Sequence, residues 1–267
     1  MAQFIKKLQN PYIKILLAPL AFIVFGIVVG MIETATRHWL NFLLLYIVVL
    51  SSELINHFFD LWKNRSQPAA RFILIFLEVI LIVATVILLK DLYWPIRVML
   101  VTYLLYLHFQ YFPYNMSKSI YGISLNTFFQ GFTLNVVAYT TQTQHLTSTF
   151  IWGLFPLVLI SLALNFEDLF LYDLFIFKRH QLPTFLTRYH STIAFIIIVL
   201  GVFLGFYFSL PSQSFYLVQF LFVSLSLLLA SPLLIRTLTT RSIQNKLNFF
   251  GSIHLIFALL YSLSYLF

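Results

Sequence analysis

The sequence predicts an all-α integral membrane protein with nine transmembrane helices. Of its 267 residues, 61 % are apolar and only 9 % are charged. A soluble domain carries about 25 % charged residues, so this chain has too few polar groups to cover a surface in water. The apolar residues also fall into nine long runs. Each run has about the 20 residues that cross a bilayer as a helix.

The nine expected helices follow one another along the chain with short connections. They cover residues 12–33, 39–59, 70–90, 93–112, 122–141, 147–168, 190–209, 215–236 and 247–267. The first run lies behind Lys6 and Lys7 like a signal peptide, but it exceeds the usual apolar core and has no convincing cleavage site. We therefore expect it to be a retained first helix. Because the connections are too short for another domain, we expect residues 1–267 to form a single transmembrane domain.

Basic residues predict the orientation of these helices. With the N-terminus in the cytoplasm, the inner segments hold thirteen Lys and Arg residues and the outer segments three. Basic residues near helix ends resist translocation, so we expect a cytoplasmic N-terminus and an outer C-terminus in a bacterial cell membrane. The formal charge of +8 then reflects topology, and no nucleic-acid partner is expected. The absence of cysteine excludes disulfides, thiolate metal sites and cysteine nucleophiles.

Acidic and amide residues gather at the cytoplasmic ends of the second and sixth runs. An ionisable group at membrane depth is costly, and it is usually paired or functional. A helix turns about 100° per residue, which places most of the first group on one stripe. The first group is Glu53, Asn56, His57, Asp60 and Asn64, and the second is Asn165, Glu167, Asp168 and Asp173.

Oxygen ligands gathered in this way suit Mg²⁺, which proteins commonly share with substrate phosphates. Basic residues in the same predicted loops can take the remaining phosphate charge. These basic residues are Arg71, Lys118, Lys178 and Arg179. The alternative is that both polar groups lie at the membrane interface among lipid headgroups.

Three motifs together resemble the UbiA superfamily of intramembrane prenyltransferases. Residues 56–64, Asn-His-Phe-Phe-Asp-Leu-Trp-Lys-Asn, are similar to the family's N-D-x-x-D-x-x-x-D motif at the end of helix two. Residues 111–118, followed by Gly122 and Gly131, resemble its Y-x-x-P-x-x-x-K stretch and later glycines. Residues 165–183 resemble the second motif, N-x-x-D-x-x-x-D followed by G-K-x-T-L-P. The motifs occur in family order, so the resemblance covers essentially the whole chain.

The chain also departs from these family patterns. In the first motif His57 stands where the family has Asp, Asn64 replaces the last Asp, and Gln67 replaces the Arg before Pro68. Asn offers a metal only a neutral oxygen, and His prefers softer metals than Mg²⁺. In the second motif Tyr172 holds the last Asp position, Asp173 follows one residue later, and Phe177 replaces the Gly before Lys178.

The resemblance implies a nine-helix UbiA-like bundle around a central cavity, with Mg²⁺ as cofactor. The implied reaction transfers an isoprenyl group from a polyprenyl diphosphate to a lipid or aromatic acceptor such as a quinone precursor. Asp60, Asp168 and Lys118 are the implied catalytic residues. The implied metal ligands are Asn56, Asp60, Asn64, Asp168 and Asp173. The implied substrate-binding residues are Asn56, Lys118, Lys178, Arg71, Tyr111 and Asn126.

The sequence is also compatible with other functions. The chain could be a noncatalytic relative that binds or moves an isoprenoid lipid. A small-molecule transporter is a third possibility, although no repeat or pair of broken helices is visible. Glu53 could be a base or a partner of His57.

Three further polar sites each have a functional and a structural interpretation. His108, with Tyr111, could bind the acceptor hydroxyl, or it could bond to a neighbouring helix. Asn126 and Gln130 share a helix face, which suits a cavity wall or interhelical hydrogen bonds. A final group is expected in the loop after the sixth run, as a cap over the site or as solvated side chains. This group is His180, Arg188 and His190.

Overall fold

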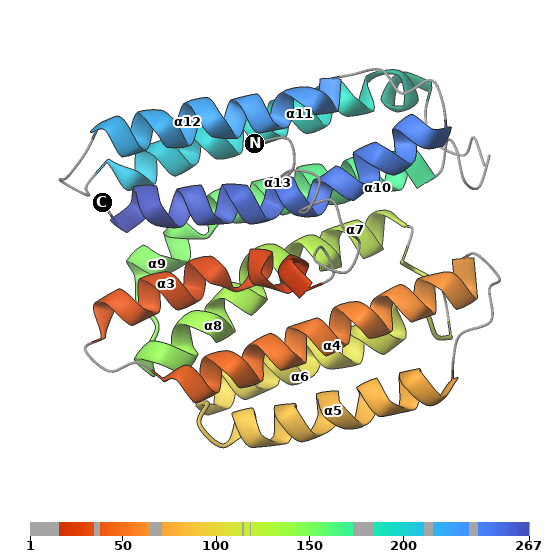
Figure 1. Cartoon of the computed structure of the whole chain (residues 1–267), viewed down its shortest axis with the longest axis vertical. Coiled ribbons are helices and arrows are strands. Elements are labelled where there is room, and N and C mark those ends of the chain that lie inside the picture. Colours follow the sequence, from red (N-terminus) through yellow and green to blue (C-terminus); the bar gives the residue numbers. More distant parts are fainter. Residues whose placement is uncertain are drawn as a thin grey trace. The chain divides into compact units, whose positions relative to one another are not determined.

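The fold is helical throughout the part of the chain that the computed structural model describes (Figure 1). The described residues are 16–34, 38–64, 71–113, 115–117, 119–172, 184–210, 216–234 and 240–266. Within helices, the side chains of residues 64, 184–187, 240–242, 244, 245 and 248 lie outside this description. No strand occurs among the described residues. The all-α prediction is therefore confirmed for them.

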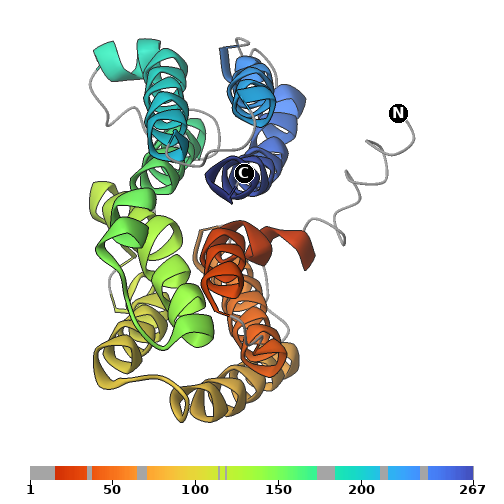
Figure 2. The ribbon, with the colours of Figure 1, turned by 90° about the vertical axis from the view of Figure 1, so that its left-hand side faces the viewer.

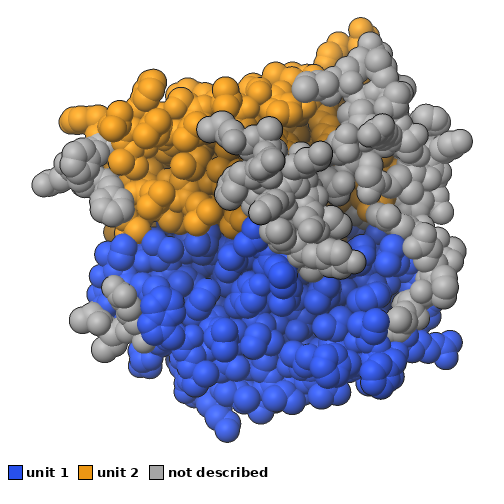
Figure 3. All heavy atoms as spheres, viewed as in Figure 1, with its two compact units in different colours: residues 1–117, 133–146 blue, residues 118–132, 147–267 orange. Residues whose placement is uncertain are grey.

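The chain divides into two compact units, coloured separately in Figure 3. Unit 1 comprises residues 1–117 and 133–146, and unit 2 comprises residues 118–132 and 147–267. The elements of unit 1 are η1 (Ala18–Phe22), α3 (Val24–Glu33), α4 (Trp39–Asn64), α5 (Arg71–Leu89), α6 (Trp94–Phe109) and α8 (Leu134–Thr143). Those of unit 2 are α7 (Ile120–Thr127), α9 (Ser148–Gly153), α10 (Phe155–Tyr172), α11 (Thr184–Ser209), α12 (Tyr216–Ala230), η4 (Ser231–Leu234) and α13 (Thr240–Leu266). The π-helical segment η2 spans Phe128–Thr133. The single domain predicted over residues 1–267 stays a prediction.

Six helical segments among the described residues are long and apolar enough to cross a membrane. They are Trp39–Lys63, Arg71–Leu89, Ser148–Tyr172, Arg188–Ser209, Tyr216–Leu234 and Phe249–Leu266. Val24–Glu33 and Trp94–Phe109 are apolar but shorter. The prediction of an integral membrane protein is supported by these helices, whereas the count of nine and the orientation remain predictions.

Two expected helices differ from continuous α-helix. In the first, η1 passes into α3 at Ile23. Pro19 stands at the start of η1, and its ring nitrogen has no hydrogen to donate to the helix ladder. In the fifth, the turn of π-helix η2 separates α7 from α8. Such turns are rare, and they often lie at functional sites.

The exposed faces of the long helices are apolar. On α5, Phe72 is 83 % exposed and Ile75 60 %, and on α12 Phe220 is 67 % exposed. Apolar surface on this scale is unusual in soluble monomers. Lipid is therefore the solvent that suits these helix faces.

In unit 1, α8 packs closely against α3 through small residues. All ten residues of α8 are buried. Gly26 and Gly30, one turn apart on α3, face α8 so closely that a Cβ on either would lie 2.9 Å from a side-chain atom of α8. The backbone N–H of Gly26 donates to Asn135 Oδ1 at 3.2 Å, and the hydroxyl of Tyr139 donates to Glu33. Small residues at this spacing let two helix backbones approach, as in membrane helix pairs.

We expect Gly26→Ala to destabilise the protein by about 1–3 kcal/mol, because the added methyl group overpacks this contact. The new Cβ would meet the backbone oxygen of Asn135 and the Cβ of Ala138. Gly251→Ala on α13 is the matched control, since no atom of the described residues lies within 4 Å of the place that a Cβ would take there. Thermal unfolding of both variants in detergent measures the difference. Equal transition midpoints for the two variants would contradict the close packing of α3 on α8.

In unit 2, helices α10 to α13 pack along one another, and Figure 2 views them nearly end-on. The helix α10 contacts α11, α13 and α7. Gly131 in η2 lies against the backbone of Val158 on α10, since a Cβ there would be 2.7 Å from the Val158 Cα. These contacts place α10 against α7, α11 and α13 within unit 2.

Candidate functional site

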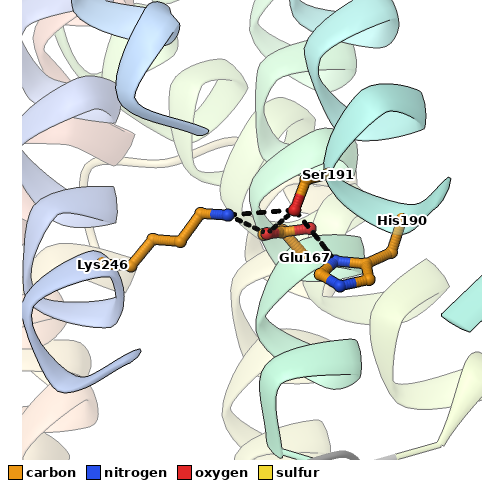
Figure 4. Close-up of polar contacts among 4 residues, drawn as sticks. All are labelled: Glu167, His190, Ser191 and Lys246. Atoms are coloured by element: carbon orange, nitrogen blue, oxygen red, sulfur yellow. Dashed lines mark hydrogen bonds and ion pairs between the residues drawn. The ribbon is translucent and has the colours of Figure 1, made fainter. Parts of the chain in front are cut away.

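A buried polar network surrounds Glu167 near the C-terminal end of α10 (Figure 4). The side chain of Glu167 is fully buried. Its Oε2 lies 2.6 Å from Nδ1 of His190, and its Oε1 lies 2.7 Å from Nζ of Lys246. The hydroxyl of Ser191 donates to Oε1 at 2.8 Å and accepts from Lys246 Nζ at 2.9 Å. One carboxylate thus joins α10 to both α11 and α13.

Helical periodicity explains why Lys246 and His190 point into unit 2. On α13 the buried positions repeat every three or four residues, the spacing of one helix face. Lys246 occupies one of these positions, as His190 does on α11. The buried stripe on α13 is Ile243, Lys246, Phe250, Ile253 and Phe257, and that on α11 is His190, Ala194, Ile198 and Val202.

The charges of Glu167 and Lys246 compensate each other inside unit 2. The side chain of Lys246 is 6 % exposed and that of Glu167 is not exposed at all. A buried ion pair of this kind is weak evidence for stability, because desolvation offsets much of the attraction. Removing one partner, however, leaves an uncompensated buried charge. The pair therefore ties α10 to α13, and His190 and Ser191 connect the same carboxylate to α11.

The sequence-based interpretation missed this network. It counted Lys246 only as a cytoplasmic basic residue and gave Glu167 no role of its own. It also expected His190 in a loop, and this was wrong, because α11 begins at Thr184 and His190 is 8 % exposed. The sequence signal that could have revealed the network is helical spacing. Lys246 stands four residues before Phe250, and His190 stands four residues before Ala194, on the buried face of each helix.

The residues of the first predicted motif lie at the end of α4 in unit 1. Asp60 is buried, with 8 % of its surface exposed. Asn56 Oδ1 accepts from the Tyr111 hydroxyl at 2.7 Å and from Gln110 Nε2 at 3.0 Å. His57 is exposed. The structure therefore brings Asn56 together with Tyr111, two of the predicted substrate-binding residues that are far apart in the sequence.

The other predicted site residues lie on several different helices or outside the described residues. Arg71 is the exposed first residue of α5. Asp168 on α10 and Asn126 on α7 are half-buried. Asn165 donates to Gln130 Oε1 at 3.2 Å and to Thr127 Oγ1 at 3.3 Å, which confirms the interhelical alternative for Gln130. The residues outside the description are Lys118, Asp173, Lys178 and His180, together with the side chain of Asn64.

Glu78 and His108 form a separate pair between α5 and α6. His108 Nε2 lies 2.9 Å from Glu78 Oε1, and Nδ1 lies 2.9 Å from the Leu104 carbonyl oxygen. The alternative in which His108 bonds to a neighbouring helix is confirmed. Glu78, which the sequence shows without an acidic neighbour in its run, has this histidine as its partner.

The predicted Mg²⁺ ligands fit the ion in chemistry, because Asp60 and Asp168 offer hard carboxylate oxygens. The oxygen of Asn56 already accepts two hydrogen bonds. It would bind a metal ion only after giving up one of them. No cluster of three or more acidic or histidine side chains suited to a metal occurs among the residues described. Asp173 is not among them, so the predicted ligand set stays a prediction.

Comparison of the chain with known proteins adds no assignment. No protein-family model matches it, and no curated protein does. The resemblance to the UbiA superfamily therefore rests on the sequence motifs.

Proposed function

We propose that this protein is a UbiA-like intramembrane prenyltransferase. It would transfer an isoprenyl group from a polyprenyl diphosphate to an aromatic or quinone-precursor acceptor. The observation that carries the proposal is the hydrogen bond between Tyr111 and Asn56, because it joins the first aspartate motif to the Y-x-x-P-x-x-x-K stretch, which begins at Tyr111 and ends at Lys118. The order of the three motifs and the six apolar helices support the same function. The proposed architecture is a nine-helix bundle around a central cavity.

In this proposal the polar helix ends bind the diphosphate and the apolar interior holds the prenyl chain. Lys118, Lys178 and Arg71 bind phosphate oxygens, as charge-assisted hydrogen bonds favour. Asp60 and Asp168 would hold Mg²⁺, which when bound stabilises the negative charge of the departing diphosphate. The apolar wall keeps water from the allylic carbocation, and aromatic rings stabilise it through their π faces.

Release of diphosphate tests the proposal directly. The purified chain in lipid vesicles is incubated with a prenyl diphosphate, a panel of aromatic acceptors and Mg²⁺, and inorganic diphosphate is measured. We expect release that depends on Mg²⁺ and stops when EDTA removes it. Binding of the prenyl lipid without any release or transfer would favour the noncatalytic isoprenoid-binding protein instead.

We expect Lys118→Ala and Lys178→Ala each to weaken prenyl diphosphate binding roughly tenfold, since a hydrogen bond to a charged group contributes about 1.5–3 kcal/mol. Lys→Arg at the same positions should have a smaller effect, although the two cations are not interchangeable. The loss should shrink at high salt, which screens charges. Lys90→Ala is the control, because Lys90 is exposed at the predicted outer end of its helix. Unchanged dissociation constants in both alanine variants would limit these lysines to a topological role.

The proposal also predicts that Asp60 and Asp168 face one cavity near the cytoplasmic surface. The chain contains no cysteine, so spin labels attach only where cysteines are introduced. We expect a short distance between labels in Asp60→Cys/Asp168→Cys, measured by double electron–electron resonance. Asp91→Cys/Asp168→Cys is the control, with Asp91 at a predicted outer end. A longer distance in the first pair than in the control would contradict the predicted cavity.

A further inference from the structure

The imidazole of His190 is held in one orientation by contacts from two directions. Its Nδ1 lies 2.6 Å from Oε2 of Glu167. Its ring is stacked on Phe170, with centroids 5.5 Å apart and planes 1° from parallel. Both contacts come from α10, which packs along α11. Together they fix the plane of the ring and the direction of its second nitrogen.

The surroundings of Glu167 determine which nitrogen carries the hydrogen. Lys246 and Ser191 both approach Oε1 as donors, so the carboxyl group of Glu167 acts as a hydrogen-bond acceptor in this network. An ionised carboxylate only accepts hydrogen bonds. His190 therefore donates from Nδ1, and in that tautomer of the imidazole the lone pair is on Nε2.

The charged groups around this histidine have opposite signs. Among the described residues, Glu167 from α10 and Lys246 from α13 are the charged groups that contact His190 or Ser191. Among the described residues, Nε2 of His190 has no hydrogen-bond partner. A carboxylate that holds Nδ1–H in this way orients an imidazole so that Nε2 acts as a base, as in hydrolase triads.

We propose that Nε2 of His190 binds the hydroxyl group of an aromatic acceptor and takes its proton. This inference rests on the proposed function and names the residue that would receive the acceptor. Adjacent residues on an α-helix point about 100° apart. Glu167, which holds His190, is the residue before Asp168, a predicted Mg²⁺ ligand near the same end of α10.

With a phenol as acceptor, proton transfer to His190 precedes formation of the new carbon–carbon bond. The O–H bond breaks, its proton passes to Nε2, and the imidazolium is stabilised by Glu167. The allylic C–O bond of the prenyl diphosphate breaks and diphosphate leaves with the electron pair. A ring carbon of the phenolate forms the new C–C bond. The hydrogen on that carbon then moves to the oxygen and restores the phenol, while His190 returns its proton to water.

Nitrogen-15 NMR of the full chain in lipid vesicles tests the binding part of this inference without any turnover. Seven histidines are present, and loss of signals in His190→Gln assigns His190. We expect the spectrum to show a hydrogen on Nδ1. Addition of phenol should shift the Nε2 resonance, whereas toluene, which lacks the hydroxyl, should not. A hydrogen on Nε2, or no shift with phenol, would overturn the inference.

Two variants separate a role in proton transfer from a structural one. In Glu167→Gln/Lys246→Met the two charges are removed together, and we expect the phenol shift to disappear from the folded protein. His190→Gln should keep the affinity for prenyl diphosphate but lower transfer to phenol on the order of 10²-fold, a typical contribution of a general base. His145→Gln, an exposed histidine in unit 1, should change neither. Full transfer activity in His190→Gln would overturn the proposed proton transfer.

The outcomes also distinguish this inference from the proposed function. A phenol-dependent shift at His190 in a chain that transfers no prenyl group would refute the prenyltransferase and keep the hydroxyl site. Prenyl transfer with no phenol contact at His190 would keep the enzyme and refute the site.

Discussion

Lys246→Met is expected to destabilise the protein by roughly 3–5 kcal/mol, the cost of leaving a buried charge without its partner. The carboxylate of Glu167 would stay fully buried and, among the described residues, would keep His190 and Ser191 as its hydrogen-bond donors. Unfolding in detergent, followed by circular dichroism against denaturant or temperature, measures the loss. Methionine keeps much of the side-chain volume, so the change isolates the charge.

A double substitution and a surface control complete this experiment. Glu167→Gln/Lys246→Met removes both charges, and we expect it to recover most of the lost stability, as is common when buried ion pairs are replaced together. Lys90→Met, at an exposed position, should lie within about 0.5 kcal/mol of the parent. A double variant that is less stable than Lys246→Met would show that the charge imbalance is not the cause.

Asp60→Asn and Asp168→Asn are each expected to lower diphosphate release on the order of 10²–10³-fold, comparable to the loss of a preorganised electrostatic contact at a transition state. The amide keeps the volume of the carboxylate and removes its charge. Turnover with Mg²⁺ is the measurement, and circular dichroism checks the fold. Asp91→Asn, an exposed acid between α5 and α6, is the matched control.

Restoring the family pattern probes the same site in the opposite direction. His57→Asp/Asn64→Asp should raise the affinity for Mg²⁺, because carboxylates replace a softer ligand and a neutral one. It should also raise the rate of prenyl transfer, if the departures from the family motif slow that reaction. A restored variant that binds Mg²⁺ and prenyl diphosphate yet transfers nothing to any acceptor would favour the isoprenoid-binding alternative.

The sequence predicted the helices well because their signal is local. A run of apolar residues is visible within about 20 positions, so the spans from Arg71 and from Tyr216 could be anticipated. The break at Ile23 and the π-helical segment 128–133 were missed, because average hydropathy does not respond to the hydrogen-bond pattern within a run.

The partners of the polar residues could be predicted only in part. Asn56 and Tyr111 were both assigned to the substrate site from motifs, and they are in contact. Nothing in the local sequence says that Glu167 meets Lys246, since their contact depends on how α10 and α13 pack. Helix periodicity places Lys246 on the buried face, but the identity of its partner requires the three-dimensional arrangement.

The close packing of α3 and α8 has a consequence for how the protein is made. Asn135, Thr140, Thr141 and Gln142 give α8 a polar character, and such side chains are unfavourable in hydrocarbon when a helix enters the bilayer alone. Because α3 precedes α8 in the sequence, its glycine surface has been synthesised before α8 leaves the ribosome. The backbone N–H of Gly26 is then ready to receive Asn135. In the predicted nine-helix topology, membrane insertion of α8 should therefore depend on a helix translated about a hundred residues earlier, as the separation of Gly26 from Asn135 shows.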